Sequence, residues 1–124
     1  MATYPELKGR VVAITGSAQG IGAETARHFA AQGAAVALLD IDEKGAQTVA
    51  AAITAAGGRA QPVRVDVTDE ASVNAAIAAT VAAFGGLDVL ITCAGGYTRL
   101  AQVADMPLDE WDRTIALNLR SAFL

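Results

Sequence analysis

The sequence predicts an α/β fold, a doubly wound parallel sheet with helices on both faces, in three layers. Short runs that are apolar at every position alternate with longer, alanine-rich stretches of helical character. Residues 11–14 and 89–91 have no polar face, as expected of parallel strands that helices cover on both sides. Strands and helices that alternate in this way are typical of α/β domains built on one sheet.

Four strand and helix pairs are expected in order along the chain. The strands are expected at residues 11–15, 35–39, 60–65 and 87–92. The helices that follow them are expected at residues 21–32, 43–56, 69–84 and 108–124. Gly33, Gly57 and Gly85 stand where the first three helices should end, and Thr68 or Asp69 should cap the third. The predicted strand order is 3-2-1-4, with a ligand crevice between the first and fourth strands, where the winding direction reverses.

Composition narrows the class of protein. With 124 residues, 53% of them apolar, the chain can build one globular domain, expected over residues 1–124. A net charge of −4 without a Lys/Arg cluster argues against nucleic-acid and anionic-membrane partners. No window reaches the ~18 apolar residues of a membrane helix. The only cysteine, Cys93, can form no internal disulfide, which favours a reducing compartment, the cytoplasm.

A glycine-rich segment directly follows the first predicted strand and directly precedes the first predicted helix. It runs Thr15-Gly-Ser-Ala-Gln-Gly-Ile-Gly22. Glycines let the backbone turn sharply and approach a pyrophosphate closely, while the positive end of the following helix attracts the phosphates. The alternative is a tight turn in a chain that is rich in glycine and alanine. The position between strand and helix favours a dinucleotide site.

An acidic residue stands where such a site needs one. Asp40 ends the second predicted strand, 18 positions after Gly22, close to the offset of ~20 residues for a carboxylate that binds the adenosine ribose. In the alternative interpretation, Asp40 and Asp42 only cap the helix that follows them. The pairing with the glycine segment favours the ribose ligand.

The spacing Gly16-x-x-x-Gly20-x-Gly22 resembles the TGxxxGIG signature of the short-chain dehydrogenase/reductase family. Four further matches follow in the family's order, namely Asp40, Asp66-Val67, Ala94-Gly95, and Trp111-Asp112 leading to Asn118-Leu119. The resemblance extends from about Leu7 to Leu124 and implies a Rossmann-type domain. One departure is that the family's NNAG motif reads Thr92-Cys93-Ala94-Gly95 here.

The resemblance implies a role for each matching residue. The pyrophosphate loop would be Gly16, Ser17, Gln19, Gly20, Ile21 and Gly22. Asp40 and Ile41 would bind the ribose, and Asp66 and Val67 would bind the adenine. Ala94 and Gly95 would pass beneath the nicotinamide ribose. Asn118 would be the first member of the catalytic Asn-Ser-Tyr-Lys tetrad and help to place a proton-relay water. The expected cofactor is NAD, with NADP disfavoured by Asp40 and by Gln19, where many NADP-preferring relatives carry a basic residue. No metal is expected.

The tyrosine and lysine of the tetrad have no counterpart at the expected place. Tyr97 lacks a lysine four residues later, and although Tyr4 and Lys8 match Tyr-x-x-x-Lys, they precede the first strand. Five strand residues at ~3.3 Å each would separate that pair from the crevice by ~15 Å or more. His28 is interpreted as a surface or packing residue. Tyr97, Arg99 and Gln102 follow the fourth strand, where they could face a substrate.

The sequence is compatible with two functions of different classes. In the first, the chain is the incomplete, cofactor-binding part of an oxidoreductase that interconverts an alcohol and a ketone by hydride transfer. The family's sheet has seven strands against four here, so we expect a longer parent protein, a homo-oligomer, and no activity from these 124 residues alone. In the second, the chain is a dinucleotide-binding module without catalysis, a redox sensor or a scaffold.

Overall fold

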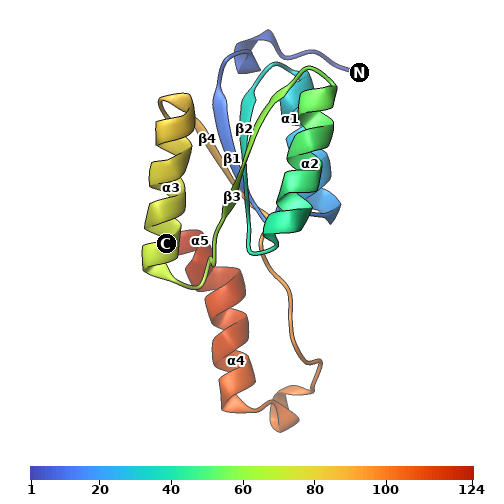
Figure 1. Cartoon of the computed structure of the whole chain (residues 1–124). Helices are drawn as coiled ribbons and strands as arrows, with labels where there is room; N and C mark the ends of the chain where they lie inside the picture. Colours follow the sequence, from blue (N-terminus) through green and yellow to red (C-terminus); the bar gives the residue numbers. More distant parts are fainter.

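A computed structural model describes all residues, 1–124. Its sheet contains four parallel strands, β1 (Val11–Thr15), β2 (Ala35–Asp40), β3 (Arg59–Arg64) and β4 (Val89–Thr92). They lie in the order β3-β2-β1-β4, so that Val12 of the central strand β1 is in register with both Val36 and Val89. The predicted sheet and its order are confirmed (Figure 1).

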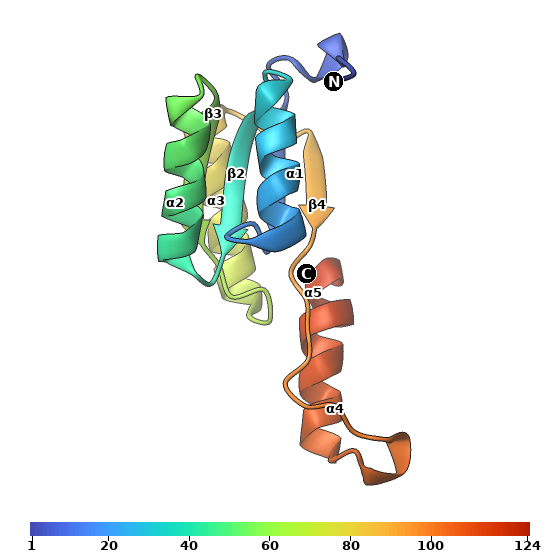
Figure 2. The same cartoon turned by 90° about the vertical axis from the view of Figure 1, so that its right-hand side faces the viewer.

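Helices cover both faces of the sheet. Helices α1 (Gly20–Ala31) and α2 (Glu43–Ala55) pack on one face and α3 (Glu70–Phe84) on the other (Figures 1 and 2). The sheet has a hydrophobic core on each face, and residues that alternate along β1 pack into one core or the other. Val12 and Ile14 are buried on the α1/α2 side, and Ala13 is buried on the α3 side. For β1 this alternation is the predicted three-layer arrangement. Residues 89–91 of β4 were expected to be covered on both sides as well, but β4 is an edge strand on which Leu90 is exposed.

The helix ends follow the sequence signals closely. Asp69, one of the two predicted caps of α3, accepts a hydrogen bond from the backbone N–H of Ser72. At the other end of α3, Gly85 adopts a left-handed conformation with φ 85°, which L-residues with a side chain rarely adopt. Asp42 caps α2 by accepting from the backbone N–H of Gly45.

The chain after β4, residues 93–124, extends beyond the carboxyl ends of the strands (Figure 2). After the short 3-10 helix η2 (Val103–Asp105), the chain forms α4 (Leu108–Ile115), the π-helical turn η3 (Ala116–Arg120) and α5 (Ser121–Phe123). The sequence predicts one regular helix over 108–124. The structure keeps the helical path but widens it at η3, and Asn118 lies inside that wider turn.

The segment that carries Tyr4 lies at the opposite end of the sheet. Its 3-10 helix η1 (Pro5–Leu7) precedes the amino end of β1, while η3 lies beyond the carboxyl ends of the strands (Figure 1). The expected separation of Tyr4 and Lys8 from the crevice is confirmed. None of the helices combines the length and the apolar character that crossing a bilayer requires.

Candidate functional site

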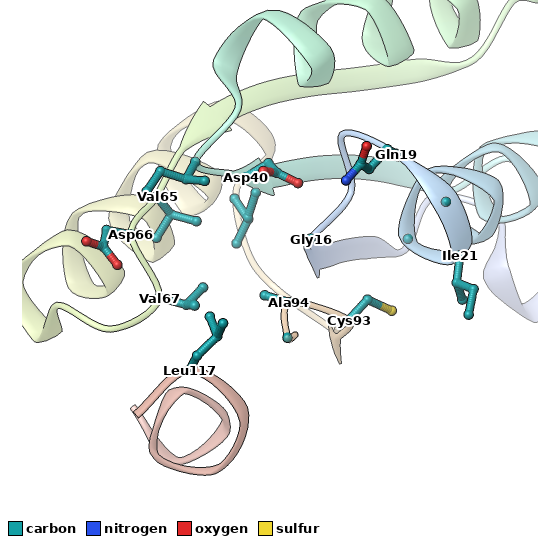
Figure 3. A pocket seen from close by; sticks show the side chains of 15 residues that line it. Gly16, Gln19, Ile21, Asp40, Val65, Asp66, Val67, Cys93, Ala94 and Leu117 are labelled. Atoms are coloured by element: carbon teal, nitrogen blue, oxygen red, sulfur yellow. The ribbon is translucent and has the colours of Figure 1, made fainter. Parts of the chain in front are cut away.

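A cleft of about 490 Å³ opens at the carboxyl ends of the strands (Figure 3). Its walls come from the segments that follow all four strands and from η3. Every residue predicted to bind a cofactor lines this cleft except Ser17. The topology therefore brings residues that are up to 101 positions apart, Gly16 and Leu117, to one site.

The glycine loop after β1 passes so close to the end of β4 that no side chain fits between them. Gly16 has φ 66°, and a Cβ added to it would lie 2.7 Å from the backbone nitrogen of Ala94. A Cβ on Gly22 would lie 2.1 Å from the carbonyl oxygen of Gly16. These two glycines allow the loop to fold back on the start of α1 and leave its backbone bare toward the cleft.

The amino end of α1 faces the same cleft. The first backbone N–H groups of a helix have no partner within the helix, and here the capping residue, Gln19, provides no side-chain hydrogen bond to them. Gly20, Ile21 and Gly22 of this first turn line the cleft. Free N–H groups and the positive end of the helix dipole together form a site that favours a phosphate or another anion.

Asp40 connects the end of β2 to the glycine loop. Its Oδ2 accepts a hydrogen bond from the backbone N–H of Ala18 at 2.9 Å, and its Oδ1 accepts one from the N–H of Asp42 at 2.9 Å. The residue that caps α2 is Asp42, so capping alone does not account for Asp40. Its half-buried carboxylate lines the cleft beside the exposed side chain of Ile41.

The segment after β3 forms an apolar wall with an acidic rim. Val65 and Val67 are buried, and the Val67 side chain points toward Leu117 of η3 (Figure 3). Asp66 Oδ1 accepts hydrogen bonds from the Thr68 hydroxyl at 2.6 Å and from the Thr68 N–H at 2.9 Å. These two bonds, the hydroxyl first, hold the pKa of Asp66 below its ordinary value. The carboxylate is therefore ionised and fixed in orientation at neutral pH.

Asn118 does not line the cleft but holds one of its walls. Its Nδ2 donates to the carbonyl oxygen of Gly96 at 2.7 Å, and its Oδ1 accepts from the N–H of Gly96 at 2.9 Å. A Cβ on Gly95 would lie 2.8 Å from that same Oδ1. The asparagine thereby joins η3 to the chain that leaves β4. On the other side, the N–H of Ala94 donates to Thr15 Oγ1 at 3.2 Å.

Ser17 is the one predicted cofactor residue that does not line the cleft. Its side chain is fully buried and its hydroxyl donates to the carbonyl oxygen of Leu39 at 3.5 Å, so only its backbone belongs to the glycine loop. The residues that the sequence analysis missed are Leu39, Val65, Cys93 and Leu117. The first three are next to predicted residues in the sequence, at the carboxyl ends of strands, and could have been predicted from that position. Leu117 could not, because it reaches the cleft only through the place of η3 in the fold.

The other candidate residues lie outside the cleft. Tyr97, Arg99 and Gln102 are exposed on the segment between β4 and η2 and do not line it. His28 is exposed on α1, where its Nε2 lies 3.2 Å from Glu24 Oε1, in agreement with its interpretation as a surface residue. The substituted motif places Cys93, half-buried, on the cleft wall and leaves Thr92 exposed outside it.

Comparison with known proteins agrees with this geometry. A family model described as short chain dehydrogenase matches residues 10–124. The D-threitol dehydrogenase of Mycolicibacterium smegmatis is 42% identical over 118 residues, which are 95% of this chain and 45% of that protein. The cis-4-hydroxycyclohexanecarboxylate dehydrogenase of Sinomonas cyclohexanicum is 46% identical over 115 residues, which are 93% and 46% of the two chains.

A solved structure gives the same result. The crystal structure of a short chain dehydrogenase from Mycobacterium smegmatis superimposes with a TM-score of 0.92 at 37% identity, covering 99% of this chain and 51% of that one. The chain thus spans about half the length of the curated relatives that it matches. Sequence signature, strand order and site geometry have one common explanation, which is that the chain belongs to the short-chain dehydrogenase family.

Proposed function

We propose that the chain is the cofactor-binding part of an NAD-dependent oxidoreductase that interconverts an alcohol and a ketone by hydride transfer. The observation that carries the proposal is the pairing of two features in one cleft. The bare loop of Gly16 and Gly22 beneath the amino end of α1 suits a pyrophosphate, and the Asp40 carboxylate beside it suits ribose hydroxyls.

The remaining walls fit the rest of such a cofactor. The apolar pair Val67 and Leu117 can enclose an adenine ring, with the ionised Asp66 at its edge. At the other end, Ala94 and Gly95 offer a backbone surface without bulky side chains, suited to the nicotinamide ribose. The nicotinamide supplies the chemistry, because it accepts or donates a hydride, while the chain's own residues bind and orient it.

NAD is favoured over NADP by the charge at the ribose end. A 2′-phosphate carries a charge of about −1.5 to −2 and would lie next to the Asp40 carboxylate, which would repel it. No Lys or Arg lines the cleft to offset that repulsion. The substrate class, an alcohol and its ketone, is supported by relatives that are dehydrogenases named for D-threitol and for cis-4-hydroxycyclohexanecarboxylate.

Asn118 is assigned to positioning within this site. Both polar atoms of its side-chain amide are bonded to the backbone of Gly96, so the side chain fixes the chain beneath the expected nicotinamide ribose. Its implied part in placing a relay water stays a prediction. So do the cytoplasmic location, for which the lone Cys93 argues, and the homo-oligomeric state of the parent protein.

Binding and its location can be tested in one experiment. NAD is titrated into the isotopically labelled 124-residue chain and backbone amide shifts are followed by NMR. We expect the largest shifts at Gly20, Ile21, Asp66 and Gly95, and none at Gly33 or Gly57 at the opposite end of the sheet. Absence of any saturable shift, or shifts confined to the opposite end, would remove the proposal. A saturable response in the cleft without hydride transfer by any longer form of the protein would favour the non-catalytic module.

A further inference from the structure

The turn η3 joins segments that follow the two outer strands of the sheet. In the order β3-β2-β1-β4, β3 and β4 form opposite edges, so neither pairs with the other. Asn118 binds the chain after β4 through Gly96, while Arg120, two residues later, binds the chain after β3. Leu117, directly before Asn118, lines the cleft itself. One helical turn therefore spans the mouth of the cleft and is anchored on both sides.

The anchor on the β3 side is a continuous path of hydrogen bonds. Arg120 Nη1 donates to the carbonyl oxygen of Thr68 at 3.1 Å. Thr68 in turn donates both its N–H and its hydroxyl to Asp66 Oδ1, and the Asp66 N–H donates to Ser72 Oγ at 2.9 Å. The turn that Arg120 contacts is the one that presents Asp66 and Val67 to the cleft.

The guanidinium has no other partner that would explain its position. Arg120 takes part in none of the ion pairs of the structure, whereas Arg113 on the same helical segment is paired with Asp109 and Glu110. Arg120 is also exposed, so its side chain adds little to the core. Leu117 packs against the core cluster that contains Val65 and Val67, and the Arg120 bond, strengthened by its charged donor, adds a directional contact that fixes the distance between the β3 turn and η3.

We propose that Arg120 is a positioning residue that sets the width of the adenine end of the cleft, by holding the turn of residues 66–68 against η3. This inference rests on the proposed cofactor site and extends it to a residue outside the cleft lining. Val67 and Leu117 face one another across that end (Figure 3). Without the Arg120 contact the two walls separate, and an adenine ring loses its fit on both faces, while the nicotinamide end, held by Asn118, is unaffected.

The test compares two halves of the cofactor on matched variants. Adenosine monophosphate and nicotinamide mononucleotide are titrated separately into the wild-type chain, Arg120→Met, Arg120→Lys and Arg113→Met. Loss of one solvent-exposed hydrogen bond predicts a rise in Kd for adenosine monophosphate of about threefold to tenfold in Arg120→Met. Arg120→Lys keeps a donor and recovers most of the affinity. Arg113→Met removes the same charge from the same segment and leaves both affinities unchanged.

A second measurement needs no ligand. Amide hydrogen exchange of the free chain should become faster at Thr68 and Asp69 in Arg120→Met, whereas Gly96, which Asn118 holds, keeps its wild-type rate. Equal exchange rates in both chains, or an equal loss of affinity for both mononucleotides, would overturn the role of Arg120. If the wild-type chain binds neither mononucleotide nor NAD, the proposed function itself fails, and the positioning role in cofactor binding fails with it.

Discussion

The carboxylate of Asp40 accepts a hydrogen bond from the backbone N–H of Ala18 at 2.9 Å, which ties the end of β2 to the glycine loop after β1. The residue assigned to the ribose thus also fixes the loop assigned to the pyrophosphate. One substitution here changes both charge and loop geometry, so the substitute must keep an acceptor oxygen. Asparagine keeps one such oxygen, which can still accept from the Ala18 N–H and loses only the bond from the Asp42 N–H, whereas alanine loses both bonds.

The first prediction is that Asp40→Asn weakens the preference for NAD over NADP. Removing the negative charge beside the 2′-phosphate lowers the ratio of the NADP Kd to the NAD Kd by roughly tenfold to several hundredfold. Isothermal titration of both cofactors measures the ratio. Asp42→Asn makes the same charge change two residues away, at a position outside the cleft lining, and should leave the ratio within about twofold. An unchanged ratio in Asp40→Asn would remove Asp40 from this role.

The second prediction concerns the close approach at Gly22. Gly22→Ala places a Cβ 2.1 Å from the carbonyl oxygen of Gly16, a contact that only a backbone shift can relieve. Overpacking of this kind lowers the free energy of unfolding by about 1–3 kcal/mol and moves the loop that carries the anion site. Chemical denaturation followed by far-UV circular dichroism measures the effect.

Gly86→Ala is the matched control for Gly22→Ala. Its added Cβ meets no atom within 4 Å, and its backbone φ is not in the left-handed region. The free energy of unfolding should therefore change by less than about 0.5 kcal/mol. If the two variants are equally stable, the space around Gly22 is larger than the structure indicates.

The fold was predictable because local pattern and topology agree. Runs without a polar face identified β1 and β4 as parallel strands, although only β1 is buried, and glycines at 33, 57 and 85 marked the helix ends. The widening at η3 was not predictable, because four of its five residues are good helix formers and the poor helix propensity of Asn118 does not by itself specify a wider turn. Ala116 even has the φ of −60° and ψ of −43° of a regular α-helix. The π-helical turn follows from the tertiary contacts of Asn118 and Arg120, which a linear pattern does not contain.

The residues that line the cleft were predictable where they belong to a continuous sequence motif or directly follow a strand. Gly16, Gly22 and Asp40 belong to such a signature, and all three line the cleft. At Ser17 the signature places the backbone in the glycine loop but does not indicate that the side chain is buried and directed toward Leu39. Leu117 was missed because it lines the cleft only where η3 crosses the mouth of the cleft, and no sequence motif indicates that crossing.

The third prediction is a pH dependence that comes from Asp88, which joins the starts of β1 and β4. The hydrogen bond that the Val11 N–H donates to Asp88 Oδ2 at 2.8 Å, assisted by Arg10, holds the pKa of this carboxyl below its ordinary value of 3.8. The folded chain therefore binds this proton less readily than the unfolded chain. The stabilisation is complete well above pH 3.8 and is lost as pH falls through the lower pKa of the folded state.

Asp88→Asn tests this pH dependence, because an amide cannot ionise. We expect it to be less stable than wild type at pH 7, with a difference that shrinks steadily below pH 3.8, where the wild-type carboxyl becomes protonated. Urea unfolding at pH 7, 5 and 3 gives the three differences. Asp112→Asn, an exposed acid without a hydrogen-bond partner, serves as the control and should show no such trend. A constant difference for Asp88→Asn at all three values would contradict the assignment.

The last prediction is that the 124-residue chain, folded and supplied with NAD and an alcohol, shows no hydride transfer above background. Of the Asn-Ser-Tyr-Lys tetrad, only the asparagine has a counterpart at the expected place, which is Asn118. The side-chain amide of Asn118 already forms hydrogen bonds with the backbone of Gly96. General acid–base assistance worth about 10²–10⁴-fold is therefore missing. Orientation of substrate against the nicotinamide is missing too, since Ala94 and Gly95 are the only lining residues of this chain assigned to that end of the cleft.

The assay follows absorbance of the reduced nicotinamide with the purified chain beside a longer form of the protein that carries a Tyr-x-x-x-Lys pair after Leu124. The Tyr4→Phe variant of the longer form provides a control, because Tyr4 and Lys8 match that motif formally but lie at the amino end of β1. Its kcat should equal that of the unsubstituted protein. Turnover by the 124-residue chain near the rate of the longer form, or a large loss of kcat in Tyr4→Phe, would show that the proton-transfer groups lie within residues 1–124 and not beyond them.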